Sequence, residues 1–113
     1  MEPYGGRINE IAPKNCAFVH RKEYFDIFVD SFWIDDSEEQ GAQDWLRNYF
    51  ESPKFKNIWS THIYQNYMNS EYKVWEEAYF GENYHELQII KSKLDPKSFF
   101  NYPQGIRPLP LKE

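Results

Sequence analysis

The most regular alternation of apolar and polar positions runs from residue 24 to residue 33, and it predicts a β-strand. One face of this strand is apolar and consists of Phe25, Ile27, Val29 and Trp33. The opposite face mixes acids with aromatics, in Tyr24, Asp26, Phe28, Asp30 and Phe32. Because acids are rarely buried, this second face is either solvated or forms the wall of a ligand pocket.

The next segment, from Ser37 to Ser52, has the apolar periodicity of a helix. Ser37 and Gln40 have the spacing of a capping box, and Pro53 is expected to stop the helix after Ser52. The apolar positions in between recur every three or four residues, which gives a helix one buried face: Ala42, Trp45, Leu46, Tyr49 and Phe50.

The second half of the chain predicts one more strand and two helices. The strand covers residues 58–67. Ser70 is a suitable cap for the next helix, and Gly81 is expected to end it, because glycine adopts a left-handed C-terminal conformation without strain. Asn83 and Glu86 are spaced as a capping box for the last helix. This helix keeps an apolar stripe up to the break at Asp95-Pro96, and the stripe consists of Leu87, Ile90 and Leu94.

These elements predict an α+β fold, in which a partial antiparallel β-sheet of two or three strands is backed by about three helices. A segment at residues 2–6 is either a further strand or a loop. So few strands leave unpaired edges and one aromatic face uncovered. We therefore expect another polypeptide, or a second copy of this chain, to complete the sheet.

Length and charge narrow the functional classes. The chain has 113 residues, the size of one small domain. With 13 Lys and Arg against 18 Asp and Glu, it carries a net charge of -5 and no basic stripe, so a nucleic-acid partner is not expected. A membrane partner is not expected either, because no apolar run approaches the length of a membrane span, and no signal peptide is recognised. The single Cys16 excludes an internal disulfide, which makes the cytoplasm the default location.

Three spaced motifs carry a family resemblance. They are Y-x-N-Y, which ends at Tyr67, then W-x-x-A-Y-F-G-x-N-Y-x-x-L from Trp75, and I-K-x-K-x-D-P-x-x-F-F from Ile90. Together with the early segments Glu2-Pro3-Tyr4-Gly5-Gly6 and Ala17-Phe18-x-His20-Arg21, they resemble the C-terminal part of berberine bridge enzyme-like flavoproteins. These are FAD-linked oxidases with the vanillyl-alcohol-oxidase type of fold. The resemblance covers nearly the whole chain, but only the last part of the family's usual length.

The resemblance implies a domain organisation and a function. Residues 1–107 would be the C-terminal part of a substrate-binding domain, with the berberine-bridge-type motif at about residues 62–107 and a flexible tail at residues 108–113. The implied activity is FAD-dependent oxidation of an alcohol-bearing small molecule, such as a sugar or a secondary metabolite. The main FAD-binding domain is not found in this sequence, so we expect the isolated chain to be inactive. A non-catalytic binding or assembly protein that retains the fold is the alternative.

The resemblance also implies roles for particular residues. Tyr67 would face the flavin and act as the base for a substrate hydroxyl, with Asn66 as a second flavin contact. Asp26 would stand where relatives carry a Glu or Gln that faces the substrate, although a register shifted by one residue would place Ile27 there. Tyr24, on the same strand face, and Glu2 would line the same pocket. From the residues alone, Tyr67 is better explained as a half-buried aromatic whose hydroxyl has found a partner.

Other chemistry finds little support in the sequence. His20, His62 and His85 show no metal-ligand spacing with carboxylates or with Cys16, so no metal site is predicted. Phosphate-binding and dinucleotide glycine motifs do not occur, and neither does a serine nucleophile elbow. The resemblance implies a small-molecule substrate and a separate FAD-domain polypeptide as partners, and the uncovered sheet allows a second copy in a homodimer instead.

Overall fold

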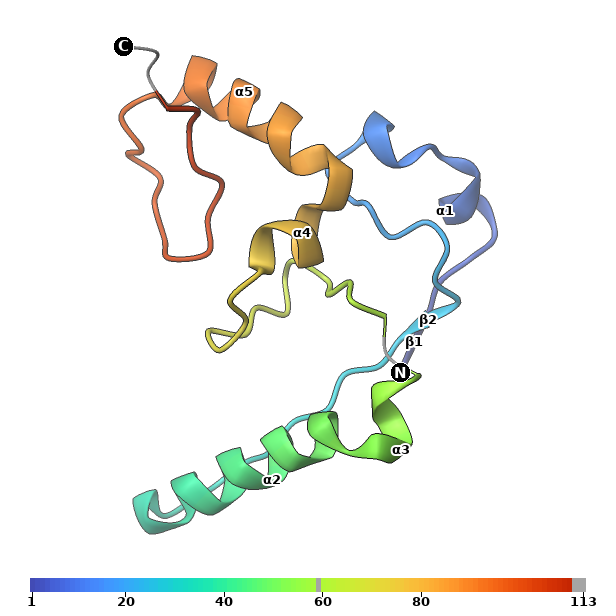
Figure 1. Cartoon of the computed structure of the whole chain (residues 1–113), viewed down its shortest axis with the longest axis vertical. Helices are drawn as coiled ribbons and strands as arrows, with labels where there is room; N and C mark the ends of the chain where they lie inside the picture. Colours follow the sequence, from blue (N-terminus) through green and yellow to red (C-terminus); the bar gives the residue numbers. More distant parts are fainter. Residues whose placement is uncertain (59, 111–113) are drawn as a thin grey trace.

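The computed structural model describes residues 1–58 and 60–110. Figure 1 shows helices α2 and α3 at one end of the molecule and α4 and α5 at the other, with a short sheet between them. The described elements, apart from short 3-10 turns, are β1 (Glu2–Pro3), α1 (Arg7–Glu10), β2 (Phe25–Asp26), α2 (Glu39–Glu51), α3 (Pro53–Lys56), α4 (Trp75–Phe80) and α5 (Tyr84–Leu94).

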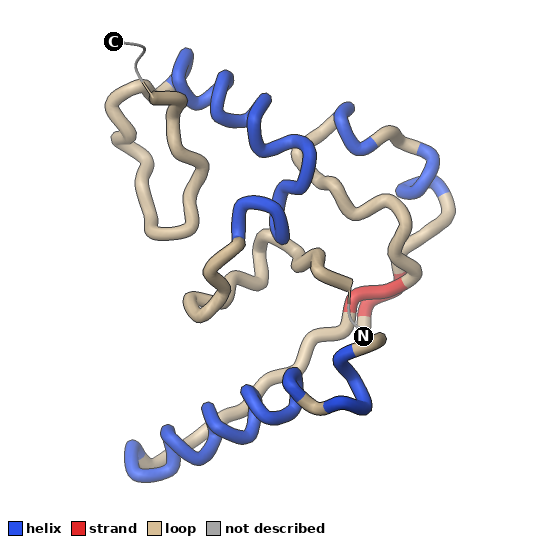
Figure 2. Tube along the Cα trace, viewed as in Figure 1, coloured by secondary structure: helices blue, strands red, loops and turns tan. Residues whose placement is uncertain are grey.

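The sheet consists of β1 and β2, which pair in antiparallel orientation with Glu2 opposite Asp26 and Pro3 opposite Phe25. Beyond the ladder, Tyr4 N–H donates to the carbonyl of Tyr24 over 2.8 Å. The predicted α+β class is thus confirmed. The predicted strand at residues 24–33 was much too long, because only Phe25–Asp26 finds a pairing partner, and that partner is itself two residues long. Figure 2 shows how little of the trace is strand.

The second predicted strand, at residues 58–67, is wrong for the residues of that range that the structure describes; Trp59 lies outside them. The backbone donors of this segment are used elsewhere. Ile63 N–H donates to the carbonyl of Ala78 in α4 over 2.9 Å, and Tyr67 N–H closes a turn onto the carbonyl of Tyr64 over 2.9 Å. A backbone that docks on a helix and then turns cannot also form a ladder.

Helix α2 confirms the helical period, but its start differs from the prediction. Asp35, rather than Ser37, makes the capping box: its carboxylate accepts a hydrogen bond from Ser37 N–H over 2.9 Å, and Glu38 reaches back to the Asp35 backbone. A 3-10 turn at Asp36–Glu38 then leads into the helix. Pro53 follows the helix as predicted, and it begins the short helix α3.

The glycine stop between α4 and α5 is confirmed. Gly81 follows α4 with a φ of 48°, and a Cβ there would lie 3.1 Å from Cγ2 of Val19, so both backbone and space require glycine. The start of α4 is later than predicted, since it begins at Trp75. Ser70 instead lies in a turn in which Asn69 accepts from Tyr72 N–H (3.1 Å) and Glu71 N–H (2.9 Å).

Helix α5 begins one residue after Asn83, yet Asn83 does not cap it. Its side chain donates to the carbonyls of Pro13 (2.9 Å) and Cys16 (3.0 Å), and this ties the N-terminal segment to the junction of α4 and α5. The helix ends before Asp95, as predicted.

Of the predicted tail, residues 108–110 are described. Leu109 N–H donates to Ser92 Oγ of α5 over 2.8 Å. Residues 111–113 lie outside the described part of the chain.

The core is centred on α4. Trp75, Ala78, Tyr79 and Phe80 are buried, and Tyr79 is wholly inaccessible to solvent. The Tyr79 hydroxyl accepts from Asn69 N–H and donates to Gln104 Oε1, both over 3.0 Å. Gln104 Nε2 in turn donates to the carbonyls of Asn69 (2.7 Å) and Tyr72 (3.1 Å). The partly buried residues packed around this centre are Ile63, Tyr72, Tyr84, Leu87 and Ile106.

Away from α4 the chain is open. Its radius of gyration is 16.9 Å, whereas a compact chain of this length has about 13 Å. Helix α2 contains no buried residue, and Trp45 on its apolar face is 53% exposed. An exposed ion pair between Arg47 and Glu71 (2.7 Å) joins α2 to the turn before α4, and such a pair contributes little to stability. Within the described segments, none of the helices combines the length and apolar character that crossing a membrane requires.

Removing the Tyr79 hydroxyl is expected to destabilise the core. Tyr79→Phe leaves the buried Gln104 Oε1 without its donor and the partly buried Asn69 N–H without its acceptor, so the free energy of unfolding should fall by about 1–3 kcal/mol. Urea denaturation followed by tryptophan fluorescence measures the change. Tyr24→Phe is the matched control, because Tyr24 is 80% exposed and its change should stay within about 0.5 kcal/mol. Equal effects of the two variants would show that this network does not stabilise the core.

Candidate functional site: a tyrosine–carboxylate cluster

The structure brings together three of the predicted site residues. Tyr67 Oη donates to Glu2 Oε1 over 3.0 Å, although the two residues are separated by 65 positions in the sequence. The pairing of β1 with β2 places Asp26 opposite Glu2 on the neighbouring strand. We call Glu2, Asp26 and Tyr67, with Tyr4 and Tyr64 beside them, the tyrosine–carboxylate cluster.

Aromatic rings hold Tyr67 in place. Phe28 stacks on its ring with centroids 5.1 Å apart, and Tyr64 meets it edge-on at 5.3 Å. Tyr64 Oη also accepts a hydrogen bond from Asn66 Nδ2 over 2.8 Å, so the predicted second flavin contact lies next to the cluster. Tyr67 remains 38% exposed and Phe28 50% exposed, so this aromatic surface is open to a ligand.

Tyr24 is the predicted site residue that the structure leaves apart. Its carbonyl pairs with Tyr4 N–H, but its side chain is 80% exposed. Tyr4 is the residue that sequence reasoning missed. It follows Glu2 by two positions, and side chains two apart on an extended segment share a face. The two-residue spacing from Glu2 could therefore have predicted that Tyr4 lies at the site.

Burial and the neighbouring acids raise the pKa of Tyr4, Asp26 and Tyr67. The pKa of Tyr4 is raised to about 12, first by burial and then by the negative charge of Asp26. The pKa of Asp26 is raised by burial and by the nearby Glu2, and its Oδ2 is buried without a hydrogen-bond partner among the described residues. Each unpaired charge in this cluster therefore favours the protonated form of its neighbours.

The pKa of Tyr67 is raised as well, chiefly because its hydroxyl donates to Glu2, and further by burial and by the charges of Glu2 and Asp26. A tyrosine that acts as a phenolate base needs its pKa lowered towards the working pH. In the described part of the chain its hydrogen-bonded neighbour is an acid. Tyr67 is thus a protonated hydrogen-bond donor here, and a carboxylate stands ready to receive its proton.

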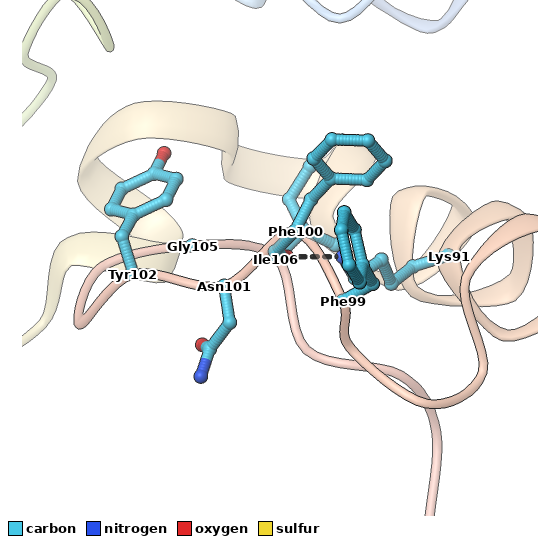
Figure 3. A pocket seen from close by; sticks show the side chains of 7 residues that line it. All are labelled: Lys91, Phe99, Phe100, Asn101, Tyr102, Gly105 and Ile106. Atoms are coloured by element: carbon cyan, nitrogen blue, oxygen red, sulfur yellow. Dashed lines mark hydrogen bonds between the residues drawn. The ribbon is translucent and has the colours of Figure 1, made fainter.

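A cavity of about 490 Å³ lies elsewhere, beside the end of α5, and it contains none of the predicted site residues. Figure 3 shows the Phe99 and Phe100 rings beside Lys91, with Tyr102 further along the loop. The Lys91 amine is already engaged with Asp95 and with the carbonyl of Phe100 (2.6 Å). Because the predicted site residues meet in the tyrosine–carboxylate cluster and not at this cavity, we take that cluster as the candidate functional site.

The chain matches known proteins over nearly its whole length. Residues 63–107 match the family model described as "Berberine and berberine like". The chain is 32% identical to berberine bridge enzyme-like 1 of Arabidopsis thaliana over 99% of its length, and 32% identical to tetrahydroberberine oxidase of Berberis wilsoniae over 96%. It is 29% identical to cannabidiolic acid synthase-like 1 of Cannabis sativa over 97%. It spans about a quarter of these relatives, 24%, 23% and 23% of their lengths.

The fold and the cluster define an α+β segment with an aromatic, acid-lined site. This segment belongs to the berberine bridge enzyme-like family. Asn66 and Tyr67 lie inside the range that the family model matches, whereas Glu2 and Asp26 precede it. The tertiary structure therefore joins residues of the matched range to residues before it.

The raised pKa of Asp26 predicts a pH-dependent stability. A carboxyl whose pKa is higher in the folded than in the unfolded chain stabilises the fold below its unfolded pKa of about 3.9. This contribution is lost as the pH rises through the folded pKa. Asp26→Asn should therefore raise the free energy of unfolding at pH 7, and the gain should shrink towards zero as the pH falls below about 4.

Urea denaturation of the wild type and Asp26→Asn at a series of pH values measures this effect. Asp30→Asn removes an exposed carboxylate from the same segment and serves as the control. A loss of stability in Asp26→Asn at pH 7 would mean that the charged carboxylate is favourably paired in the fold.

Proposed function

We propose that this chain forms part of the substrate-binding domain of an FAD-dependent oxidoreductase that oxidises an alcohol-bearing substrate such as a sugar or a secondary metabolite. The hydrogen bond between Tyr67 and Glu2 is the observation that carries this proposal. It joins a tyrosine to a proton acceptor on an open aromatic surface. The family membership and the name of the relative tetrahydroberberine oxidase support an oxidative reaction.

The residues present fit the ring side of a flavin. Asn66 offers an amide, Tyr67 a phenol, and Phe28 an exposed aromatic face, all within one aromatic cluster. Asn66 and Tyr67 would contact the cofactor, while Glu2 and Asp26 would line the substrate side. A bound flavin would supply the acceptor for the hydride that leaves the substrate carbon.

The arrangement of the cluster favours a relay for the substrate proton. As the substrate O–H bond breaks, its proton passes to Tyr67 Oη, and the proton already on Tyr67 passes to Glu2 Oε1. The phenol thus never has to exist as a free phenolate, which its raised pKa disfavours. Asp26 carries the buried, unpaired Oδ2 and would orient the substrate hydroxyl by a hydrogen bond.

An exposed apolar surface supports the proposal that this chain binds a partner polypeptide. The apolar positions left exposed in the described chain include aromatics on the segment after β2 and on α2, such as Phe28, Phe32, Trp33 and Trp45. Burying such a surface is the usual driving force for association. We propose that it is covered by a polypeptide that carries the FAD domain or, in a purified sample, by a second copy of this chain.

A chimera tests the proposed chemistry. The segment of berberine bridge enzyme-like 1 from Arabidopsis thaliana that aligns with this chain is replaced by residues 1–113, and reduction of the flavin is followed without oxygen by absorbance, with a panel of sugar and phenolic alcohols. Tyr67→Phe should slow flavin reduction on the order of a hundred- to ten-thousand-fold, because the proton route is cut. Glu2→Gln should slow it as well, by removing the acceptor.

Tyr102→Phe is the matched control, since it deletes a tyrosine hydroxyl outside the cluster. Flavin content, read from the absorbance spectrum, must stay equal among the variants. Normal flavin reduction in Tyr67→Phe, in a chimera that reduces its flavin with at least one alcohol, would exclude Tyr67 as the proton acceptor. A chimera that binds flavin but is reduced by no alcohol would reject the proposed substrate class.

The exposed apolar surface generates a separate prediction. Sedimentation velocity of the purified chain at several concentrations should show an average mass that rises with concentration. Trp45→Lys together with Phe32→Lys places charges on this surface and should shift the population towards the monomer. A single monomeric species at every concentration would contradict the association.

A further inference from the structure

Two histidines and a glutamate meet outside the tyrosine–carboxylate cluster. His20, Glu23 and His62 each offer one ligand atom, and these three atoms all lie within 4.8 Å of one another. Glu23 Oε1 and His62 Nδ1 are already 3.0 Å apart, and the two imidazole centroids are 5.8 Å apart. The sequence spacing of these residues does not predict a metal site, because His62 lies 42 positions beyond His20.

His20 has a ring nitrogen that is available to bind a metal ion. Only 3% of this residue is exposed, and its buried Nε2 has no hydrogen-bond partner among the described residues. The same imidazole also makes a backbone hydrogen bond with Ile63. Ligating histidines commonly hold one ring nitrogen on a backbone carbonyl and use the other for the metal. A neutral imidazole leaves that second lone pair available.

The surroundings favour a cation. A cavity of about 520 Å³ adjoins the cluster and is lined by Glu23 and His62 together with Glu77 and Glu82. Lys22 is the basic side chain on that lining. Three carboxylates against one amine, in a chain with a net charge of -5, attract a positive ion to this cavity.

We propose that His20, Glu23 and His62 bind one divalent transition-metal ion, with Zn²⁺ as its simplest representative, and that a fourth position opens into the adjoining cavity. Imidazole nitrogen with carboxylate oxygen is a donor set that suits Zn²⁺. Bonds of about 2.0–2.2 Å in a tetrahedron place ligand atoms about 3.3 Å apart. The Glu23–His62 pair already has nearly this separation, so His20 must approach by no more than about 1.5 Å.

The ion would act as a clamp between distant segments. His20 and Glu23 lie just before β2, and His62 lies just before the docked Ile63 and the turn at Tyr64. A metal that joins them would hold the turn carrying Tyr67 against the segment that leads into β2. Binding to the folded chain but not to the unfolded chain would raise its thermal stability.

Isothermal titration of the full chain with Zn²⁺ tests the site. We expect one ion per chain and a rise in the melting temperature, and Co²⁺ in place of Zn²⁺ should show the visible absorption of a low-coordinate site. Glu23→Gln and His62→Gln should each weaken binding by more than about tenfold, the loss that even a change in the outer shell of ligands can cause. These two side chains are partly exposed, at 20% and 37%, so their variants are expected to fold.

His85→Gln is the matched control, because His85 is an exposed histidine on α5 outside the cluster. Its affinity for Zn²⁺ should equal that of the wild type, and circular dichroism checks that all variants keep the fold. The proposal is overturned if the wild type shows no saturable binding. It is equally overturned if Glu23→Gln and His62→Gln, folded as the wild type, bind Zn²⁺ as tightly as His85→Gln does.

Discussion

The buried hydroxyl of Tyr79 is the interaction on which the rest of this structure depends. It joins Gln104 to Asn69, and so it connects α4 with the loop after α5 and with the turn before α4. A fully buried tyrosine needs both partners, because an unsatisfied hydroxyl in the core is costly. Once α4 is held in this way, its Ala78 carbonyl receives Ile63 N–H and positions the segment that ends at Tyr67. The segment that carries Tyr67 is therefore attached to the core on both sides, through Ile63 before it and Asn69 after it.

The tyrosine–carboxylate cluster places acidic groups close together, so that the charged form of one disfavours the charged form of the next. Glu2 and Asp26 face each other across the two strands, and each disfavours the charge on its neighbours. A pair of like charges destabilises a fold, and groups perturbed in this way are common at functional sites. The result is a group of phenols that stay protonated beside carboxylates that can accept a proton. Such a combination suits a proton relay better than a lone phenolate, whose stabilisation would require cations nearby.

Much of the chain could be predicted from the pattern of residues alone. The amphipathic period of α2, the stop at Gly81 and the end of α5 before Asp95 were all predicted, because each depends on local conformational preference. The motifs around Tyr67, Trp75 and Ile90 identified the family, since their spacing is a property of the sequence itself. The α+β class followed from the same patterns, whereas the strands were predicted far too long.

Only the tertiary structure decided which strands pair and which side chains from distant segments meet. A strand exists only where a second strand pairs with it, so residues 24–33 form a strand only at Phe25–Asp26. Asn83 has the sequence spacing of a cap, yet it bonds to Pro13 and Cys16, because the fold presents their carbonyls to it. The meeting of Tyr67 with Glu2, and of His20 with His62, requires the chain to close over dozens of residues. Local preference specified the helices and their ends, whereas only long-range packing could bring these side chains within bonding distance.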